Sequence, residues 1–505
     1  MTLSWLIFPV AIPAMTAAFL VLAARRSLTA QRSLSILATV AQLALAIGLY
    51  VMARDGAPHV YWLGHWPAPF GIVLVLDRLS ATMLLLTAFL AIGVVLAATG
   101  EWDKRGRHFH ALFQFQLLGI NGAFLTGDLF NLFVFFEVLL IASYGLMLHG
   151  AGAKRMKAGF HYVAINLIGS TVFLFAAGLI YAVVGTLNFA DLAAKVPQVT
   201  SADQPLLAAG ALLLLAVFAI KSSLVPLHWW LPPTYGSTLP PVAALFAIMT
   251  KVGVYSIIRV FTLVFGADAG GLAQIASPWL LPAAIVTLVL GTIGVLASRN
   301  LRTLTCYSLI ASTGTLLIGI GLFTAPGLAS GLYYLLQSTL ASAALFLLVG
   351  VVLKETDNRT QIIRFPQHAS LLAGLYFCLA IASVGMPPLA GFIGKLLILD
   401  AGRAAASMAS VWPAILITSL LMIIGFATIG IRLFWNTPTT AHAPEPDAAR
   451  LPVLTIAVIG AMIIAIAALS VFAGPVMNDM TAATDQLLAP RNYIDAVLRP
   501  PLAMR

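Results

Sequence analysis

The sequence predicts an all-α integral membrane protein with about fourteen transmembrane helices. Of its 505 residues, 61% are hydrophobic and only 9% are charged, which leaves too little polar surface to cover a water-soluble globule. Apolar runs of about 20 residues, the length that a helix needs to cross a bilayer, recur along the whole chain. Because the runs are continuously apolar and do not alternate, they predict helices and not the strands of a membrane barrel.

The apolar runs follow one another with short polar joints between them. The first has no basic residue ahead of it and has Arg25 and Arg26 directly behind it, an order that favours an uncleaved span over a signal peptide. The expected spans are 3–23, 32–53, 79–99, 110–127, 129–149, 160–185, 205–224, 240–263, 277–297, 303–323, 328–353, 369–399, 409–434 and 452–473.

The basic residues predict the orientation of these spans. If the joints after odd-numbered spans are cytoplasmic, the cytoplasmic joints hold twice as many Lys and Arg as the joints on the opposite side. Arg259 is counted on the opposite side. This asymmetry places both termini outside the cytoplasm. Because Lys and Arg that flank membrane helices explain the net charge of +10, we expect these charges to face a lipid bilayer, and we expect no nucleic-acid partner.

Motifs for cofactor binding and covalent chemistry are missing from the sequence. Cys306 and Cys378 lie far apart in apolar spans and belong to no Cys/His cluster. There is no Walker loop, no dinucleotide-binding glycine pattern and no nucleophile elbow. We therefore expect no metal or other cofactor, and no enzyme activity.

Four charged residues fall inside the predicted spans: Glu137, Lys221, Lys251 and Lys395. A charge at the centre of a bilayer costs about 2.5 to 3.5 kcal/mol on insertion scales unless it is paired or hydrated. Lys221 and Lys395 lie near the ends of their runs, so their amines could instead extend to the lipid headgroups. We favour a chain of exchangeable protons through the middle of the membrane, and call these four side chains the relay residues.

Proline is expected to break the seventh and the twelfth span. Pro226 follows Lys221 in "KSSLVPLHWWLPP", and Pro387 and Pro388 precede Lys395 in "SVGMPPLAGFIGK". Each break removes backbone hydrogen bonds and leaves carbonyls that water or side chains must satisfy. Broken helices at corresponding places in two halves of a chain are typical of transporters built from inverted repeats.

Other polar side chains are weaker candidates for the proton path. His228 lies at the polar end of the first break beside two tryptophans, so it is equally well explained as an anchor at the membrane interface. Spans 303–323 and 328–353 supply hydroxyl and amide groups, although Ser and Thr in membrane helices more often bond backbone carbonyls. These candidates are Ser308, Thr313, Gln337 and Ser338.

Over its whole length the chain resembles the antiporter-like subunits shared by respiratory complex I and the Mrp/Pha-type multisubunit cation/proton antiporters. The resemblance rests on Glu137, "KSSLVPLHWWLP" at 221–232, "MTKVGVY" around Lys251, "NLRTLTCYSLIASTG" at 300–314 and the lysine after the second proline break. Two further stretches, "GHWPAPFGIVLVLDRLSATM" at 64–83 and "KAGFHYVAINLIGS" at 157–170, are similar to the D-type antiporter subunits.

The resemblance implies a fold of fourteen helices with two inverted five-helix repeats, formed by helices 4 to 8 and 9 to 13. It also implies an ion pair of Glu137 with Lys221, a central relay at Lys251 and a terminal proton site at Lys395. Many complex I relatives carry a His and a Lys on helix 11 where this chain has serines, so the last link is expected to use water and hydroxyls. The expected divisions are 1–109 with helices 1 to 3 and an extracytoplasmic loop, 110–263 and 277–434 with the two repeats, and 435–505 with a loop, helix 14 and a tail that contacts solvent or partners.

These features predict a proton-translocating subunit of a secondary antiporter that exchanges Na⁺ or K⁺ for H⁺ across a bacterial inner membrane. Its expected partners are antiporter subunits of the A, B, C, E, F and G types. One alternative is a proton-pumping subunit of a complex I-type NADH dehydrogenase or a membrane-bound hydrogenase. The other is an assembly scaffold that transports nothing. The stretch 64–83 disfavours the first alternative, and the three lysines available to one buried carboxylate disfavour the second.

Overall fold

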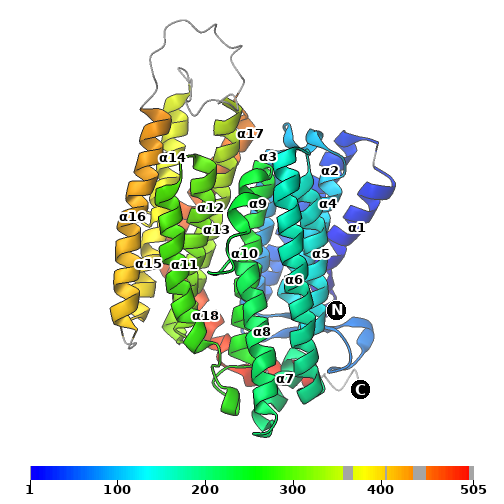
Figure 1. The fold of residues 1–505 in the computed structure, drawn as a ribbon. Helices are drawn as coiled ribbons and strands as arrows, with labels where there is room; N and C mark the ends of the chain where they lie inside the picture. The colour runs from blue at the N-terminus through cyan, green and yellow to red at the C-terminus, as the bar shows by residue number, and fades with distance from the viewer. Residues whose placement is uncertain (1, 25, 356–367, 404–406, 436–450, 500–505) are drawn as a thin grey trace, which may run out of the picture.

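A computed structural model describes the chain except residues 1, 25, 356–367, 404–406, 436–450 and 500–505. The described chain is a bundle of long helices with one short hairpin (Figure 1). Its helices are α1 (Phe8–Leu22), α2 (Leu28–Ala53), α3 (Arg78–Ala98), α4 (Phe109–Leu125), α5 (Leu129–Leu148), α6 (Ala153–Val184), α7 (Phe189–Lys195), α8 (Gln204–Ser222), α9 (Leu231–Ser237), α10 (Pro240–Leu263), α11 (Ser277–Ala297), α12 (Leu301–Gly321), α13 (Ala325–Glu355), α14 (Ala369–Val384), α15 (Ala390–Ala401), α16 (Met408–Phe434), α17 (Val453–Val471), α18 (Ala473–Leu487) and α19 (Pro490–Leu498).

The structure confirms an all-α membrane fold. Twelve helical segments of the described chain are long and apolar enough to cross a membrane. The two other predicted spans fall on α4, which has 17 residues, and on the interrupted pair α14 and α15. The number of membrane crossings and the division into repeats stay predictions.

The two halves of the bundle meet along α10 and α13. In Figure 1, α1 to α10 lie on one side and α11 to α17 lie on the other, and α10 packs on α13 where the two groups meet. α10 packs on α3, α8 and α13, and every one of its residues is buried. Burial of every residue means that α10 is surrounded by other helices of the protein and not by lipid. In a bilayer, such contacts between helices depend on close packing and hydrogen bonds.

Both predicted helix breaks are present. α8 ends at Ser222, and Ser223 takes a left-handed conformation with φ of 60° before α9 begins at Leu231. α14 ends at Val384, followed by Gly385 with φ of 80°, and α15 begins at Ala390. Residues in this conformation end a helix and leave its last carbonyls without helical partners.

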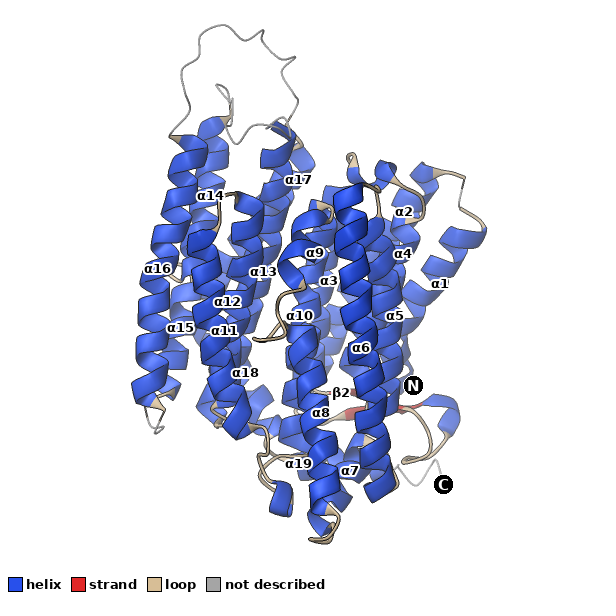
Figure 2. Ribbon diagram, in the orientation of Figure 1, coloured by secondary structure: helices blue, strands red, loops and turns tan. Residues whose placement is uncertain are grey.

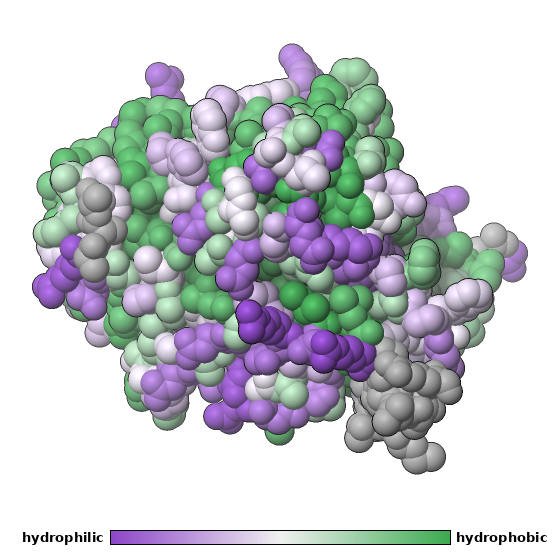
Figure 3. Space-filling model, turned by 90° about the horizontal axis from the view of Figure 1, so that it is seen from below, coloured by the Kyte–Doolittle hydropathy of each residue, from purple (hydrophilic) through white to green (hydrophobic). Residues whose placement is uncertain are grey.

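The C-terminal tail packs on the bundle, and most of its residues keep some exposure to solvent. α18 lies against α3 and α13, and α19 lies against α7. α18 is amphipathic and buries Met480, Ala483 and Leu487, which recur at helical spacing. These helices and the hairpin of β1 (His59–Trp62) and β2 (Val73–Leu76) lie near one end of the bundle (Figure 2). Hydrophilic residues gather in the middle of that face (Figure 3).

Candidate functional site

Lys251 lies at the centre of the bundle. It is 0% exposed, twelve residues into α10. Its Nζ donates a hydrogen bond to the hydroxyl of Thr250 at 3.3 Å. An amine in this position reaches neither membrane surface by extending its side chain, which agrees with the depth expected from the sequence.

Glu137 is positioned by the start of α5. The side chain of Asp128 accepts a hydrogen bond from the backbone N–H of Asn131 at 2.8 Å and caps the helix. Glu137 then lies on the third turn of α5, where its side chain is partly exposed at the protein surface. Its Oε1 accepts a short hydrogen bond from the hydroxyl of Ser170 on α6.

Lys221 is held by the same face of α6. Its Nζ donates to Oδ1 of Asn166 at 2.9 Å, and the amide of Asn166 donates to the carbonyl of Tyr162 at 2.8 Å. Lys221 is buried at the end of α8, with its Nζ 5.8 Å from the centre of the Phe136 ring.

The expected ion pair of Glu137 and Lys221 is not a direct contact. In the part of the chain that the structure describes, no carboxylate oxygen lies within 4.0 Å of the Lys221 amine. The two residues are connected through α6, where Asn166 and Ser170 are separated by one helical turn. The indirect link has a geometric reason, because α6 packs against both α5 and α8.

Lys395 closes the second helix break. Its Nζ donates to the carbonyl of Val384, the last residue of α14, at 2.7 Å and contacts the hydroxyl of Ser419 on α16 at 2.8 Å. A cation near a helix C-terminus is favoured because it faces carbonyls that lack helical partners. The residue is 5% exposed, so its amine is held inside the protein and does not extend to the headgroups.

The weaker candidates from α12 and α13 are all buried, and two of the four bond their own helices. Thr313 donates to the carbonyl of Leu309 at 3.0 Å, and Ser338 donates to that of Leu335 at 3.3 Å. Ser308 is buried as well.

Gln337 differs from these hydroxyls. Its Oε1 is buried and accepts no hydrogen bond from any described residue. Its amide nitrogen lies next to Gly391, on the first turn of α15 that carries Lys395: a methyl group added at Gly391 would come within 2.9 Å of it. Gln337 is therefore the polar group of α13 that points to the second break.

The first break presents His228 and Pro226 near its surface. Pro226 is exposed and His228 is half-buried. The neighbouring Trp230 is buried and donates through its indole N–H to the carbonyl of Ile220 at 3.2 Å. At the first break the Trp230 indole therefore bonds a carbonyl near the end of the helix. At the second break, where Pro387 and Pro388 separate α14 from α15, the Lys395 amine does the same.

Arg259 was wrongly counted with the joints outside the membrane. It lies within α10, 3% exposed, and binds Asp77 through two hydrogen bonds of 2.5 and 2.9 Å. Asp77 is 2% exposed and caps α3. Burial alone would raise the pKa of Asp77, but Arg259 and the N–H of Ser80 hold that pKa below its usual value.

Sequence reasoning missed three residues in this site. Asn166 and Ser170 lie in the stretch 157–170, which carried a resemblance but no assigned role. Amides and hydroxyls in a helix give no signal until the partners on α5 and α8 are known. Asp77 lies in the stretch 64–83, and its partner is 182 residues away.

Asp128 offers a pH-dependent test of this end of the site. Burial raises the pKa of its carboxyl to about 6, above the usual 3.8. The folded protein therefore binds this proton more tightly than the unfolded chain, and stability falls as the pH rises through this interval. Asp128→Asn keeps a side chain suited to capping α5 and removes the charge.

We expect the Asp128→Asn variant to be more stable than wild type by about 1 kcal/mol at pH 8, where the wild-type carboxyl is charged, and by less at pH 5, where more of it is protonated. The difference at pH 8 is no larger because Asp128 is partly exposed and solvent screens its charge. The thermal midpoint of the solubilised protein at the two pH values measures this. An equal shift at both would show that ionisation of Asp128 has no part in it.

The family model "NADH:quinone oxidoreductase/Mrp antiporter, TM" matches residues 126–425. A probable K⁺/H⁺ antiporter subunit of the D type from Rhizobium meliloti is 40% identical, over 99% of this chain and 98% of its own length. A Na⁺/H⁺ antiporter subunit of the same type from Bacillus subtilis is 35% identical, over 86% and 88%.

Two solved structures have the same fold. A chain of the Mrp complex from Dietzia sp. DQ12-45-1b superposes with a TM-score of 0.86 at 28% identity, covering 99% of this chain and 100% of that one. A chain of respiratory complex I from Thermus thermophilus with bound NADH superposes with a TM-score of 0.77 at 25% identity, covering 97% and 100%.

Proposed function

The chain belongs to the NADH:quinone oxidoreductase/Mrp antiporter family, and from this we propose that, as a D-type antiporter subunit, it carries protons across the membrane along the relay residues. It does so in exchange for Na⁺ or K⁺, the cations in the names of its relatives. Its partners are the other antiporter subunits. In this proposal the chain needs no cofactor, and the bonds that change are the N–H and O–H bonds of the transferred protons.

The observation that carries the proposal is the arrangement at α6. One helix face holds the Lys221 amine through Asn166 and, one turn away, the Glu137 carboxylate through Ser170. A carboxylate one helical turn away favours the protonated form of the lysine amine, because opposite charges attract. A shift of α5 relative to α6 would separate the two charges and favour passage of the proton to the next relay residue.

The partial exposure of Glu137 supports a link to the cation step. α5 and α6 present large apolar side chains at the surface, such as Ile141 at 65% and Phe160 at 74% exposed. Such a face is covered by lipid or by a partner subunit. A neighbouring subunit that moves with the cation could therefore act directly on α5 and on Glu137.

The two helix breaks support the division of the chain into two inverted repeats, 110–263 and 277–434, flanked by 1–109 and 435–505. In each repeat an interrupted helix carries a relay lysine beside the break. We place both termini outside the cytoplasm of a bacterial inner membrane, on the distribution of Lys and Arg.

The experiment that tests the function uses inverted membrane vesicles that contain the whole antiporter complex. A pH gradient is established, Na⁺ or K⁺ is added, and its collapse is followed with a pH-sensitive dye. We expect one of the cations to collapse the gradient in wild type, and Lys251→Met to reduce this exchange to the background of vesicles without the complex.

Lys195→Met is the matched control. Lys195 pairs with Asp191 at 2.8 Å on α7, away from the relay residues. We expect this variant to exchange like wild type at equal assembly. Normal exchange in the Lys251→Met complex would refute the proposed path, and an assembly scaffold would then explain the buried charges better.

A further inference from the structure

The face of α10 that carries Lys251 continues as a column of polar side chains. Tyr255 and Arg259 follow at intervals of four residues, so all three lie along one side of the helix. The Tyr255 hydroxyl donates to the carbonyl of Phe124 at 2.6 Å. The Arg259 guanidinium donates to the Tyr255 oxygen from Nε and Nη2, both at 3.3 Å. The column thus points from the centre of the bundle to the end where α19 lies.

The column ends in the buried pair of Arg259 and Asp77. Its two hydrogen bonds of 2.5 and 2.9 Å form a bidentate contact, the strongest geometry for this pair of groups. Asp77 is fixed in turn by the start of α3, where it accepts from the N–H of Ser80 at 2.8 Å. The pair therefore joins α10 to α3, and both partners are almost completely excluded from solvent.

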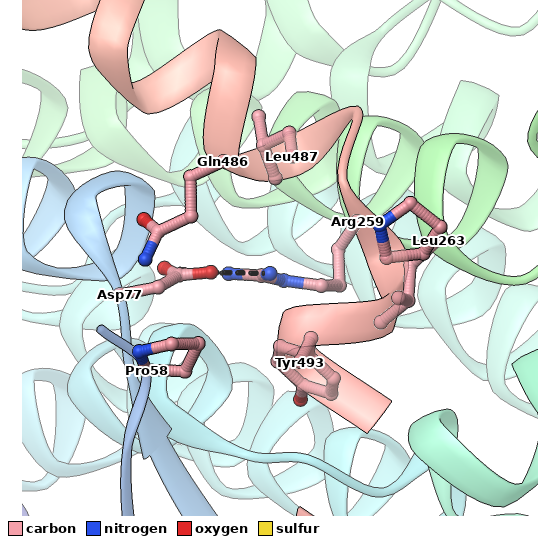
Figure 4. A pocket seen from close by; sticks show the side chains of 8 residues that line it. Pro58, Asp77, Arg259, Leu263, Gln486, Leu487 and Tyr493 are labelled. Atoms are coloured by element: carbon pink, nitrogen blue, oxygen red, sulfur yellow. Dashed lines mark hydrogen bonds and ion pairs between the residues drawn. The ribbon is translucent and has the colours of Figure 1, made fainter. Parts of the chain in front are cut away.

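The C-terminal helices cover this pair. The ring of Tyr493 on α19 lies 5.4 Å from the Arg259 guanidinium carbon. Gln486 at the end of α18 accepts from the N–H of Arg78 at 2.9 Å and donates to the carbonyl of Gly56 at 3.0 Å. Between the pair and this cover lies a cleft with room for about one water molecule, about 10 Å³ (Figure 4).

Two buried polar atoms of the covering helices have no partner among the described residues. They are the hydroxyl oxygens of Tyr493 on α19 and of Thr484 on α18. Both are buried and both belong to the covering helices. Buried hydroxyls without a partner are uncommon in folded proteins, and they gain hydrogen bonds where water enters. The cover is thus the part of this region that gains most from hydration.

We infer that the Asp77–Arg259 pair, covered by α18 and α19, is a gate that closes the proton relay at this end of the membrane. The inference rests on the proposed function. Arginine does not release its proton in proteins, so Arg259 cannot pass a proton on. Asp77 can accept a proton only when the pair separates. The closed pair is therefore a barrier that prevents a leak.

The test measures proton leak without any exchanged cation. Vesicles with the whole complex receive a pH gradient in a choline medium free of Na⁺ and K⁺, and its decay is followed. The double variant Asp77→Asn, Arg259→Gln keeps hydrogen-bonding side chains of similar shape and removes both charges. We expect the gradient to decay several-fold faster than in wild type, and Lys251→Met added to the double variant to restore the wild-type rate.

Asp191→Asn with Lys195→Gln is the matched control, since this ion pair lies on α7 near the same end of the bundle but off the column. It should not change the decay. Should the gate variant assemble poorly, Tyr493→Leu removes the ring over Arg259 and is expected to give a smaller leak.

Two results would overturn the gate. The first is decay of the pH gradient at the wild-type rate in the assembled double variant, or in Tyr493→Leu if the double variant does not assemble. The second is a leak that persists when Lys251→Met is added. Failure of the proposed function is a separate result, since it appears as normal cation-driven exchange in the single Lys251→Met variant.

Discussion

Replacement of Glu137 by glutamine is expected to lower cation-driven proton exchange by about 10-fold or more, because it removes the negative charge near Lys221, and a loss of about 1.4 kcal/mol of electrostatic stabilisation slows a rate 10-fold. Glutamine has nearly the same size and can still accept a hydrogen bond from Ser170. It cannot supply the negative charge that Lys221 faces across one turn of α6. The variant therefore tests the charge and leaves the packing of α5 in place.

The measurement is the rate of gradient collapse after addition of the exchanged cation, at matched amounts of assembled complex. Asp485→Asn is the control, since Asp485 is an exposed carboxylate on α18. Ser170→Ala should give an intermediate rate, because it removes the bond and keeps the charge. If the Glu137→Gln complex exchanged at the wild-type rate, Glu137 would be a structural residue and the relay would begin at Lys221.

Hydropathy predicted the membrane helices because the bilayer imposes one rule on every span. A helix in lipid needs an apolar surface about 20 residues long, so a span can be recognised from consecutive residues without knowledge of the fold. The position of Lys251 followed from the same rule, since eleven residues of its run precede it. Proline likewise predicted the breaks after Lys221 and before Lys395, because the loss of a backbone N–H is a local property.

Pairs formed by distant residues could not be predicted in this way. Arg259 lies four residues before the end of its predicted span, a position from which a free arginine would extend to the headgroups. Only the fold brings Asp77 to it and makes the pair internal. Asn166 and Ser170 became part of the site for the same reason. The burial of α18 could have been predicted, because Met480, Ala483 and Leu487 recur at helical spacing.

Gly314 on α12 is expected to tolerate no larger side chain. A methyl group added there would lie 2.4 Å from the backbone nitrogen of Leu288 and 2.9 Å from the carbonyl oxygen of Ala284, both on α11. From the other side, a methyl group on Gly291 would lie 2.6 Å from the nitrogen of Ala311. The two helices pack backbone against backbone, as small residues permit in membranes.

Gly314→Val should therefore destabilise the protein by about 3 kcal/mol, the upper end of the usual cost of overpacking, because the clash is with backbone that cannot rotate away. The amount of assembled complex in the membrane and its thermal midpoint after solubilisation measure the effect. Gly178→Val on α6 is the control, since nothing lies within 4 Å of a methyl group placed there. Equal stability of the two variants would contradict the close packing of α11 on α12.

The two variants should fail in different ways, and the difference separates packing from transport. Gly314→Val changes no relay residue and no direct contact of one, so each complex that still assembles should exchange at nearly the wild-type rate while their number falls. Glu137→Gln changes no packing contact, so the number of complexes should stay constant while each one slows. If Gly314→Val also slowed each assembled complex, the α11–α12 contact would have to move during transport, and the second half of the bundle would not be a rigid support for Lys395.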